Sequence, residues 1–190
     1  VTLDGKRIQT PAIATDEPAR ITVDGKPLPV AGPPRLWRYH KPSGLVTTNR
    51  DPEGRTTIFE KLPARLPRVV TVGRLDLTSE GLLLLTNDGG LARALELPAT
   101  GWVRAYRARV RGQADERALL RLKDGVTIEG VRYGSIEASV DRQQGSNAWL
   151  TVMLREGKNR EVRRVLEHLG YPVSRLIRIA YGPFQLGDLA

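Results

Sequence analysis

The strongest constraint on the fold is an apolar run framed by turn residues. Four consecutive leucines occupy positions 82–85, between Gly81 and the turn sequence Thr-Asn-Asp-Gly at 86–89. A shorter valine-rich run at 69–72 lies just upstream and ends at Gly73. Apolar runs of this length bounded by turn residues are typical of buried strands. We therefore expect two core strands joined by a short connector that begins Gly73-Arg74-Leu75-Asp76.

That connector carries an acidic residue in an unusual place. A carboxylate fixed on a tight turn between core strands has few rotamers and a rigid support, which suits a nucleophile or a general base. In the alternative interpretation, Asp76 only caps the turn or pairs with Arg74. The local pattern alone leaves both interpretations open.

The rest of the chain alternates short strands with few helices. The clearest helix is 161–169, where Val162, Val165, Leu166 and Leu169 recur at helical spacing before Gly170. Such runs of strands with interspersed helices predict an α+β fold, a largely antiparallel mixed sheet with flanking helices. Further helices are expected at 57–62, 90–97 and 115–123, and further strands at 36–40, 102–110, 126–128, 134–140, 149–154 and 173–181.

The first 30 residues read as a separate small unit. Residues 1–6 and 21–26 each run from a strand into an Asp-Gly turn, which predicts two hairpins. Val30-Ala31-Gly32-Pro33-Pro34 has the composition of an extended linker, because two prolines deny backbone donors. We therefore divide the chain into 1–30, a linker at 31–34, and a main domain at 35–190.

Composition excludes several classes of site. Cysteine is absent, so no disulfide, thiolate nucleophile or thiolate metal site is available. The two histidines, His40 and His168, are far apart, which argues against a histidine-rich metal centre or a catalytic triad. No apolar run is long enough to span a bilayer and no signal-like segment is seen, so we expect a cytoplasmic protein without membrane contact.

The charge points to a polyanionic partner. The formal net charge is +9, yet residues 1–30 carry four basic and four acidic side chains, so the excess lies downstream. Arginine clusters replace counterions along a phosphate backbone and also stack and bond bidentately, which favours nucleic acid over a merely solvated basic surface. The two clusters are Arg104, Arg107, Arg109 and Arg111, and then Arg155, Lys158, Arg160, Arg163 and Arg164.

Four ordered segments together resemble pseudouridine synthases of the RsuA type. Gly73–Asp76 with the run 81–89 resembles the catalytic motif, 41–44 the opening motif, and 155–164 with 174–182 the C-terminal motif. Asp51-Pro52-Glu53-Gly54-Arg55 is most similar to the branch that modifies large-subunit ribosomal RNA. The resemblance covers about residues 35–189. Residues 1–30 resemble the C-terminal end of the small RNA-binding module that precedes the catalytic domain, without its helical half.

The resemblance implies a pseudouridine synthase fold with a central catalytic cleft. It also implies isomerisation of a uridine in large-subunit ribosomal RNA. Because reactant and product are isomers, no cofactor, metal or energy source is required. Asp76 is then the catalytic carboxylate, and Tyr106 stacks on the base. Leu176 packs beneath the base, and Arg74 fills the space that the flipped uridine leaves. Other expected substrate-binding residues are Arg104, Arg107, Lys158, Arg160 and Arg164.

Arg163 is expected to be the counter-charge of Asp76. On the 161–169 helix it lies at the edge of the apolar stripe, about 100° from Val162, and it matches the family's salt-bridging position. A nearby arginine lowers a carboxyl pKa by roughly 1–3 units, which would keep Asp76 ionised. Arg164 lies nearly opposite the stripe and is better placed for solvent or phosphate.

Two other functions compete with this interpretation. Asp76-Leu77-Thr78 is similar to the start of aspartate-dependent phosphatases, but those need a second carboxylate where Thr78 stands to help hold Mg²⁺. A non-catalytic ribosome-assembly factor would use the same basic cleft without chemistry. Within the isomerase interpretation, small-subunit ribosomal RNA is the alternative substrate. A monomer is expected.

Overall fold

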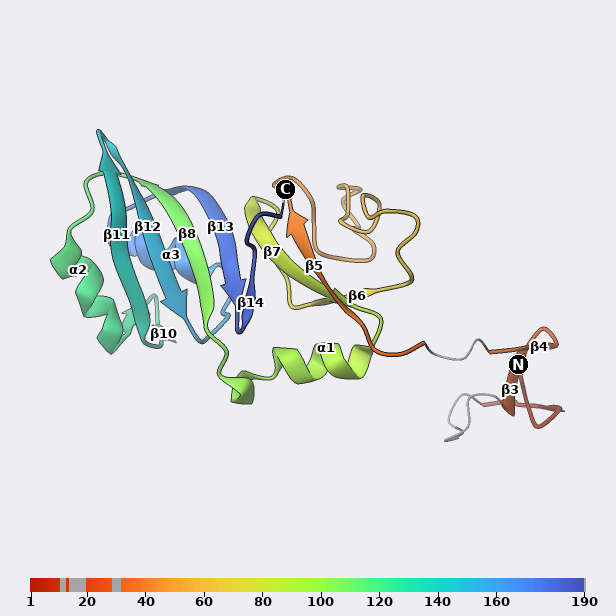
Figure 1. Ribbon diagram of the computed structural model, residues 1–190. Helices are drawn as coiled ribbons and strands as arrows, with labels where there is room; N and C mark the ends of the chain where they lie inside the picture. The colour runs from red at the N-terminus through yellow and green to blue at the C-terminus, as the bar shows by residue number, and fades with distance from the viewer. Residues whose placement is uncertain (11–12, 14–19, 29–31, 190) are drawn as a thin grey trace. The chain divides into compact units, whose positions relative to one another are not determined.

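The computed structural model describes residues 1–10, 13, 20–28 and 32–189. Its contacts divide the chain into two compact units, residues 1–34 and 35–190 (Figure 1). Residues 30 and 31 of the expected linker lie outside the described part. The chain's described helices include none long and apolar enough to cross a membrane.

The small unit is a four-stranded antiparallel sheet with the order β2-β1-β3-β4. Asp4-Gly5 and Asp24-Gly25 form the tight turns, and all four residues have positive φ, as two-residue hairpin turns require. The two hairpins match the expectation from sequence. The strands are β1 (Thr2–Leu3), β2 (Lys6–Arg7), β3 (Ile21–Val23) and β4 (Lys26–Pro27).

The large unit is built on an eight-stranded sheet with the order β11-β12-β8-β13-β7-β5, with β14 beside β13 and β6 beside β7. Every pairing is antiparallel except that of β13 with β7, so the predicted, largely antiparallel sheet is confirmed. The strands are β5 (Leu36–Lys41), β6 (Val70–Val72), β7 (Ser79–Thr86), β8 (Arg104–Arg111), β11 (Ile136–Gln144), β12 (Asn147–Leu154), β13 (Val173–Tyr181) and β14 (Phe184–Gln185).

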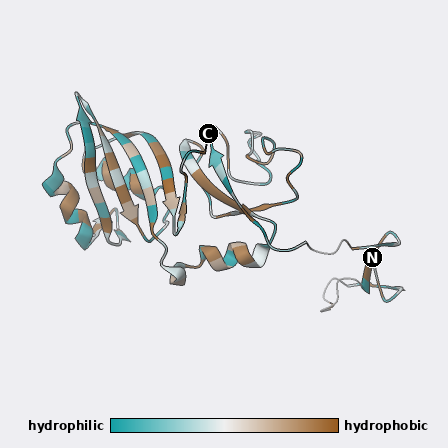
Figure 2. Ribbon diagram, in the orientation of Figure 1, coloured by the Kyte–Doolittle hydropathy of each residue, from teal (hydrophilic) through white to brown (hydrophobic). Residues whose placement is uncertain are grey.

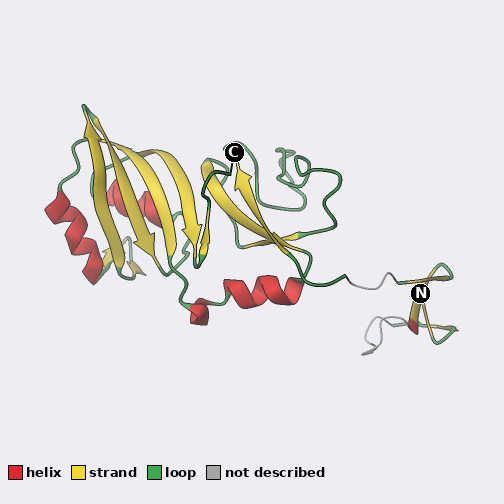
Figure 3. Cartoon of the chain, viewed as in Figure 1, coloured by secondary structure: helices red, strands yellow, loops and turns green. Residues whose placement is uncertain are grey.

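Few helices flank this sheet (Figure 3). Aspartate side chains begin two of them: Asp88 accepts from Leu91 N at 2.8 Å, and Asp115 accepts from Arg117 N at 2.9 Å. A separate two-stranded sheet pairs β9 (Val126–Ile128) with β10 (Val131–Tyr133). The helices are α1 (Gly89–Glu96), α2 (Glu116–Leu120), α3 (Glu161–His168) and the 3₁₀ turns η2 (Pro98–Thr100) and η3 (Arg121–Asp124).

Strand alternation sends neighbouring residues of β8 to opposite faces of the sheet. Ala108 and Val110 are buried in the core that includes the apolar side of α3, and Tyr106 packs against that core. Arg107, Arg109 and Arg111 are exposed on the other face. Figure 1 shows α3 behind the sheet, and Figure 2 shows hydrophobic and hydrophilic residues alternating along the strands.

The four leucines of β7 are buried on both faces of the sheet. Leu83 and Leu85 join a core with Ile58 under the loop after β5, whereas Leu82 and Leu84 join a core beside α1. Two-sided burial explains why the sequence shows a continuous apolar run rather than alternation. It buries β7 among β5, β6 and β13, directly after the connector that carries Asp76.

One predicted helix is wrong. Residues 57–62 form a turn, in which Glu60 accepts from Thr57 N at 2.9 Å and Lys61 N donates to Ile58 O at 3.0 Å. Pro63 follows and lacks an N–H to extend a helix, so the segment stops after one turn. The strand expected at 134–140 is β11, whereas β10 and β14 were not predicted.

Candidate active site

The connector between β6 and β7 is anchored through its main chain. From Arg74 to Thr78, each carbonyl accepts a hydrogen bond from a residue outside the connector. The donors are Arg178 Nη1 to Arg74 O (3.5 Å), Thr47 Oγ1 to Leu75 O (2.8 Å), Lys41 Nζ to Asp76 O (3.1 Å), Gly44 N to Leu77 O (2.8 Å) and Arg163 Nη2 to Thr78 O (3.1 Å). The side chain of Leu75 is buried in the core beneath. This network fixes the backbone that presents Asp76.

Asp76 lies in the wall of a pocket of about 350 Å³. Its carboxylate is 34% exposed. Tyr106 from β8 and Leu176 from β13 line the same pocket, and Leu176 is buried. The sheet therefore brings an acid, an aromatic ring and an apolar residue together from three strands or their ends. The volume lies in the range of small-molecule sites, which run from roughly 300 to 1,000 Å³.

The pocket is lined by more cations than anions. Asp76, Glu96 and Glu161 supply the carboxylates, and the basic side chains are Arg74, Arg104, Lys158, Arg160 and Arg178. Such a lining suits a ligand that carries phosphates. In the described part of the chain, no cluster of three or more His, Cys, Asp or Glu residues is placed to hold a metal ion.

The predicted ion pair of Asp76 with Arg163 is not formed in the structure, where Arg160 lies closer to the carboxylate. Arg160 Nη1 lies 3.8 Å from Asp76 Oδ2, and no pair within 4.0 Å joins Arg163 to Asp76. Arg163 is half-buried, as its place on α3 predicts, and its guanidinium donates to Thr78 O and to Val173 O at 3.0 Å. Burial and the charge of Arg160 lower the Arg163 pKa, whereas Asp76 raises it. Arg163 therefore contacts the backbone that carries Asp76, and Arg160 faces its carboxylate.

The backbone conformation at Arg160 explains why its contact with Asp76 was not predicted from the sequence. Arg160 is the residue before α3 and has φ 51° and ψ 28°, the left-handed region. A non-glycine side chain there costs on the order of 1–3 kcal/mol, and such residues cluster at functional sites. Helical spacing could not place this side chain, because the residue is not helical.

The other predicted substrate-binding residues divide into three groups. Arg74 and Leu176 line the pocket, and Arg74 is exposed. Arg104 and Lys158 also line it, but Arg104 donates to Arg155 O at 2.6 Å and Lys158 Nζ to Arg132 O at 2.9 Å, so both hold neighbouring loops. Arg107 lies on the opposite face of the sheet, and Arg164 is exposed on α3; neither lines the pocket.

Three pocket or connector residues were not found from the sequence. Lys41 is fully buried and also donates to Pro42 O and Ser79 O, at 3.0 and 2.9 Å; burial lowers its pKa to about 8. Burial also raises the pKa of Glu161, whose Oε2 accepts from Lys158 N. Arg178 donates to Leu82 O at 2.7 Å. All three lie in segments that carry the family resemblance (41–44, 155–164 and 174–182), and Arg178 is also two residues from Leu176 on the same strand face, but none was assigned a role from the sequence.

Comparison with known proteins identifies this arrangement. The family model described as RNA pseudouridylate synthase matches residues 35–168. The chain belongs to this family. An uncharacterized RNA pseudouridine synthase of Rickettsia felis is 46% identical over 100% of this chain and 82% of its own length. The ribosomal large subunit pseudouridine synthase B of Haemophilus influenzae is 47% identical over 80% of this chain, which spans 43% of that protein.

Solved structures show the same fold. A crystal structure of a pseudouridylate synthase superposes with a TM-score of 0.72 and 21% sequence identity, covering 98% of this chain and 80% of that one. The predicted pseudouridine synthase fold is therefore confirmed, and the chain is an isomerase of the RNA pseudouridylate synthase family.

Proposed function

We propose that this pseudouridine synthase isomerises a uridine of large-subunit ribosomal RNA, with Asp76 as the catalytic carboxylate. The observation that carries the assignment of Asp76 is its position: it is half-exposed in the pocket on a backbone held at five consecutive carbonyls. The large-subunit substrate is supported by the similarity to the synthase B of Haemophilus influenzae and by the Asp51–Arg55 sequence.

The reaction breaks the bond between N1 of uracil and C1′ of ribose and forms a bond from C5 to C1′. The proton on C5 leaves, and N1 gains one, so reactant and product have the same atoms. Asp76 attacks the nucleotide or takes its proton. Tyr106 stacks on the detached base, Leu176 packs beneath it, and Arg74 occupies the gap left in the RNA. These residues hold the base in the pocket while it turns.

The basic residues around the pocket have different roles in this proposal. Arg160 faces the Asp76 carboxylate at 3.8 Å and supplies its counter-charge. Arg163 holds the Thr78 carbonyl and, through it, the turn that presents Asp76. Lys158 and Arg104 shape the pocket rim with their backbone contacts and add positive charge toward RNA phosphates.

The experiment compares Asp76→Asn with Asp124→Asn. Asp124 is exposed on η3, so its variant makes the same chemical change outside the pocket. Each protein is given unmodified large-subunit and small-subunit ribosomal RNA, and tritium release from carbon 5 of labelled uridine is measured. Asp76→Asn should lose activity by on the order of a thousandfold or more while still binding RNA, and Asp124→Asn should match the wild type.

The same assay tests the alternatives. Release from small-subunit RNA alone would overturn the substrate assignment. Binding without release by the wild-type protein would favour an assembly factor. An Asp76→Asn rate within tenfold of the wild type would remove Asp76 from the chemistry.

A further inference from the structure

The sheet face opposite α3 carries a group of exposed arginines away from the pocket. Arg107, Arg109 and Arg111 project there from alternate positions of β8, whereas Tyr106 projects into the pocket. The described helix α3 packs on the pocket side, and α1 packs against β6 and β7. Figure 1 shows this face of β8, β12 and β11 toward the viewer without a helix across it.

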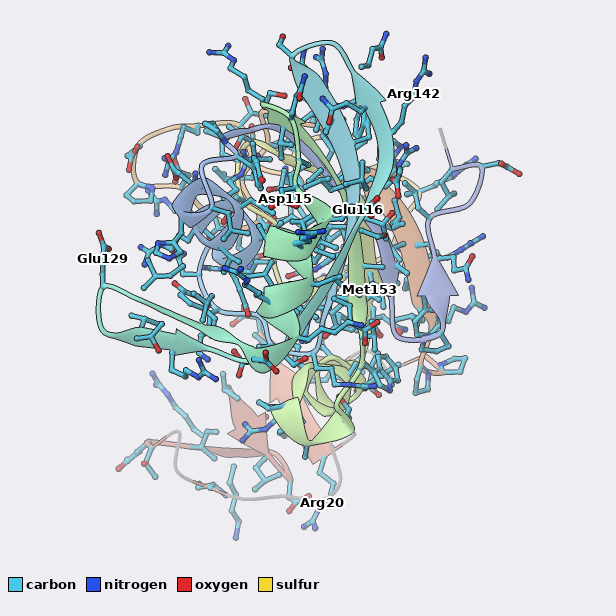
Figure 4. All side chains as sticks on the ribbon, turned by 90° about the vertical axis from the view of Figure 1, so that its left-hand side faces the viewer. Arg20, Asp115, Glu116, Glu129, Arg142 and Met153 are labelled. Atoms are coloured by element: carbon cyan, nitrogen blue, oxygen red, sulfur yellow. The ribbon has the colours of Figure 1, made fainter. Side chains whose placement is uncertain are left out.

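Strand register sets three arginines and one tryptophan of this face in one row. Arg142 of β11 is opposite Trp149 of β12, Trp149 is opposite Arg109 of β8, and Arg109 is opposite Arg175 of β13. Neighbouring strands lie about 4.8 Å apart, so the row spans about 14 Å. Figure 4 shows Arg142 beside the tip of the β11–β12 hairpin. We name Arg107, Arg109, Arg111, Arg142, Trp149 and Arg175 the arginine face.

The charges on this face are only partly compensated. Arg175 forms a two-pronged ion pair with Glu80 at 2.9 and 2.8 Å, and Arg107 lies 3.4 Å from Asp141. Arg109, Arg111 and Arg142 have no acidic partner within 4.0 Å among the described residues. Like charges that lie close together on one sheet face repel each other, and Arg109, Arg111 and Arg142 keep their charge uncompensated there. An anionic ligand would offset that repulsion.

The face also offers a surface for stacking. The guanidinium of Arg107 lies 5.0 Å from the ring centroid of Trp149, and Trp149 itself is half-buried. Sheets that bind unpaired RNA combine aromatic rings, on which bases stack, with basic side chains along the backbone. An acidic protein surface would match the arginines but would make no use of the ring.

We propose that the arginine face is a second RNA-binding surface, which holds an unpaired segment of the substrate RNA outside the target site. Arg109, Arg111 and Arg142 bind phosphates, and one base stacks at Trp149. The inference rests on the proposed function only in that the substrate is RNA. Because Tyr106 and Arg107 project to opposite faces, an RNA in the pocket reaches this face only by passing an edge of the sheet. A long RNA can do so, and a short stem-loop cannot.

The test uses the full chain with Arg109, Arg111 and Arg142 all changed to Gln. The matched control changes Arg93, Arg117 and Arg121 to Gln, which removes the same charge from exposed sites on α1, α2 and η3. Affinity is measured across a salt series for a long ribosomal RNA fragment and for a short stem-loop that carries the target uridine. Single-turnover isomerisation of the stem-loop is measured in parallel.

The face variant should bind the long RNA more weakly and flatten its plot of log affinity against log salt by about 2, since each phosphate contact on a single strand contributes about 0.7. Stem-loop binding and turnover should equal the wild type. Trp149→Leu should weaken long-RNA binding roughly tenfold without changing the slope.

Equal losses in the face and control variants, or an unchanged affinity of the face variant for long RNA, would overturn the proposal; the latter would leave an acidic protein as the partner. Failure of the wild type to isomerise the stem-loop would count instead against the proposed function. Thermal unfolding of each variant separates loss of binding from loss of fold.

Discussion

At the scale of single residues, the site consists of a rigid backbone that carries a half-exposed carboxylate. Moving the main chain at Asp76 would break hydrogen bonds at several consecutive carbonyls, and each contributes roughly 0.5–1.5 kcal/mol. The side chain of Asp76, in contrast, faces the pocket. Rigid support with an accessible reactive group is the arrangement that catalysis by a positioned carboxylate needs.

Arg160 and Arg163 should differ when replaced. Arg160→Ala and Arg160→Gly both remove the charge facing Asp76, so both should lower single-turnover rates to the same extent. The free energy of unfolding should be about 1 kcal/mol higher for the glycine variant than for the alanine variant, because glycine adopts the left-handed backbone at position 160 without strain. Urea unfolding and saturated rates of the two variants measure both effects.

Arg163→Met provides the comparison. It removes the bonds to Thr78 O and Val173 O, so it should lower both stability and turnover. It should leave the salt dependence of RNA binding unchanged, because its guanidinium bonds to backbone rather than facing RNA. If Arg160→Gly kept full turnover and Arg163→Met lost it, the direct counter-charge would be Arg163 after all.

Lys41 predicts a pH dependence of stability. Its folded pKa of about 8 lies below the ordinary value of 10.5, so between these two pH values the unfolded chain binds more protons than the folded one. The free energy of unfolding should therefore rise as pH increases from 8 toward 10.5, by up to about 3 kcal/mol. Unfolding in urea at a series of pH values measures this, with Lys41→Met as the variant that should lack the rise. A rise of the same size in Lys41→Met would assign it to another group.

The placements predicted correctly from the sequence are those that depend on local pattern. Asp76 is the only acid on its connector, and the half-burial of Arg163 follows from helical spacing. The Arg160 contact and the burial of Lys41 depend on a left-handed backbone and on the packing of β5 against β7, which no local pattern shows.

At the scale of elements, the parallel pairing of β7 with β13 joins the two halves of the sheet at the pocket. At Gly81 a Cβ atom would lie 2.3 Å from Arg178 O and 2.7 Å from Arg178 N, and φ is +100°. Only glycine lets the two backbones approach this closely. The close approach at Gly81 therefore brings Arg178 and Leu176 of β13 beside the connector.

Gly81→Ala should destabilise the protein by about 3 kcal/mol or more, because the clash is with backbone atoms that cannot move aside. Turnover of the folded fraction should fall as well, since Arg178 bonds to both Leu82 O and Arg74 O. Gly89→Ala is the control: it stands at the start of α1 with nothing within 4 Å, and it should be neutral or slightly stabilising. Equal stability of the two variants in urea would show that β7 and β13 can separate without cost.

The elements predicted correctly from sequence include those of eight or nine residues, such as β7, β8, β12, β13 and α3. The segments that were predicted wrongly or missed are short. Residues 57–62 contain a capping pair and three apolar residues, which is enough for one turn but not for a helix before Pro63. β10 and β14 are strands of three and two residues, whose pairing depends on a partner rather than on their own pattern.

At the scale of the whole molecule, the positive charge and the described pocket belong to the same unit. Residues 1–30 carry equal numbers of acidic and basic side chains, and the excess of +9 lies downstream. The pocket and all three hydrophobic cores are formed within residues 35–189. Both the chemistry and most of the attraction to RNA should therefore reside in that unit, whatever contacts residues 1–30 add.

A chain that begins at Arg35 should fold and remain active. Its thermal unfolding midpoint should stay within a few degrees of the full chain, because no core residue is lost. Stem-loop turnover should be unchanged. The slope of log affinity against log salt should change by less than about 0.9, the contribution of one phosphate contact if duplex RNA behaves like duplex DNA, because the removed segment is neutral. Any drop in affinity without a change of slope would measure contacts of residues 1–34 other than ion pairs. Loss of turnover, or a slope flattened by more than one contact, would show that the small unit takes part in catalysis or in phosphate binding.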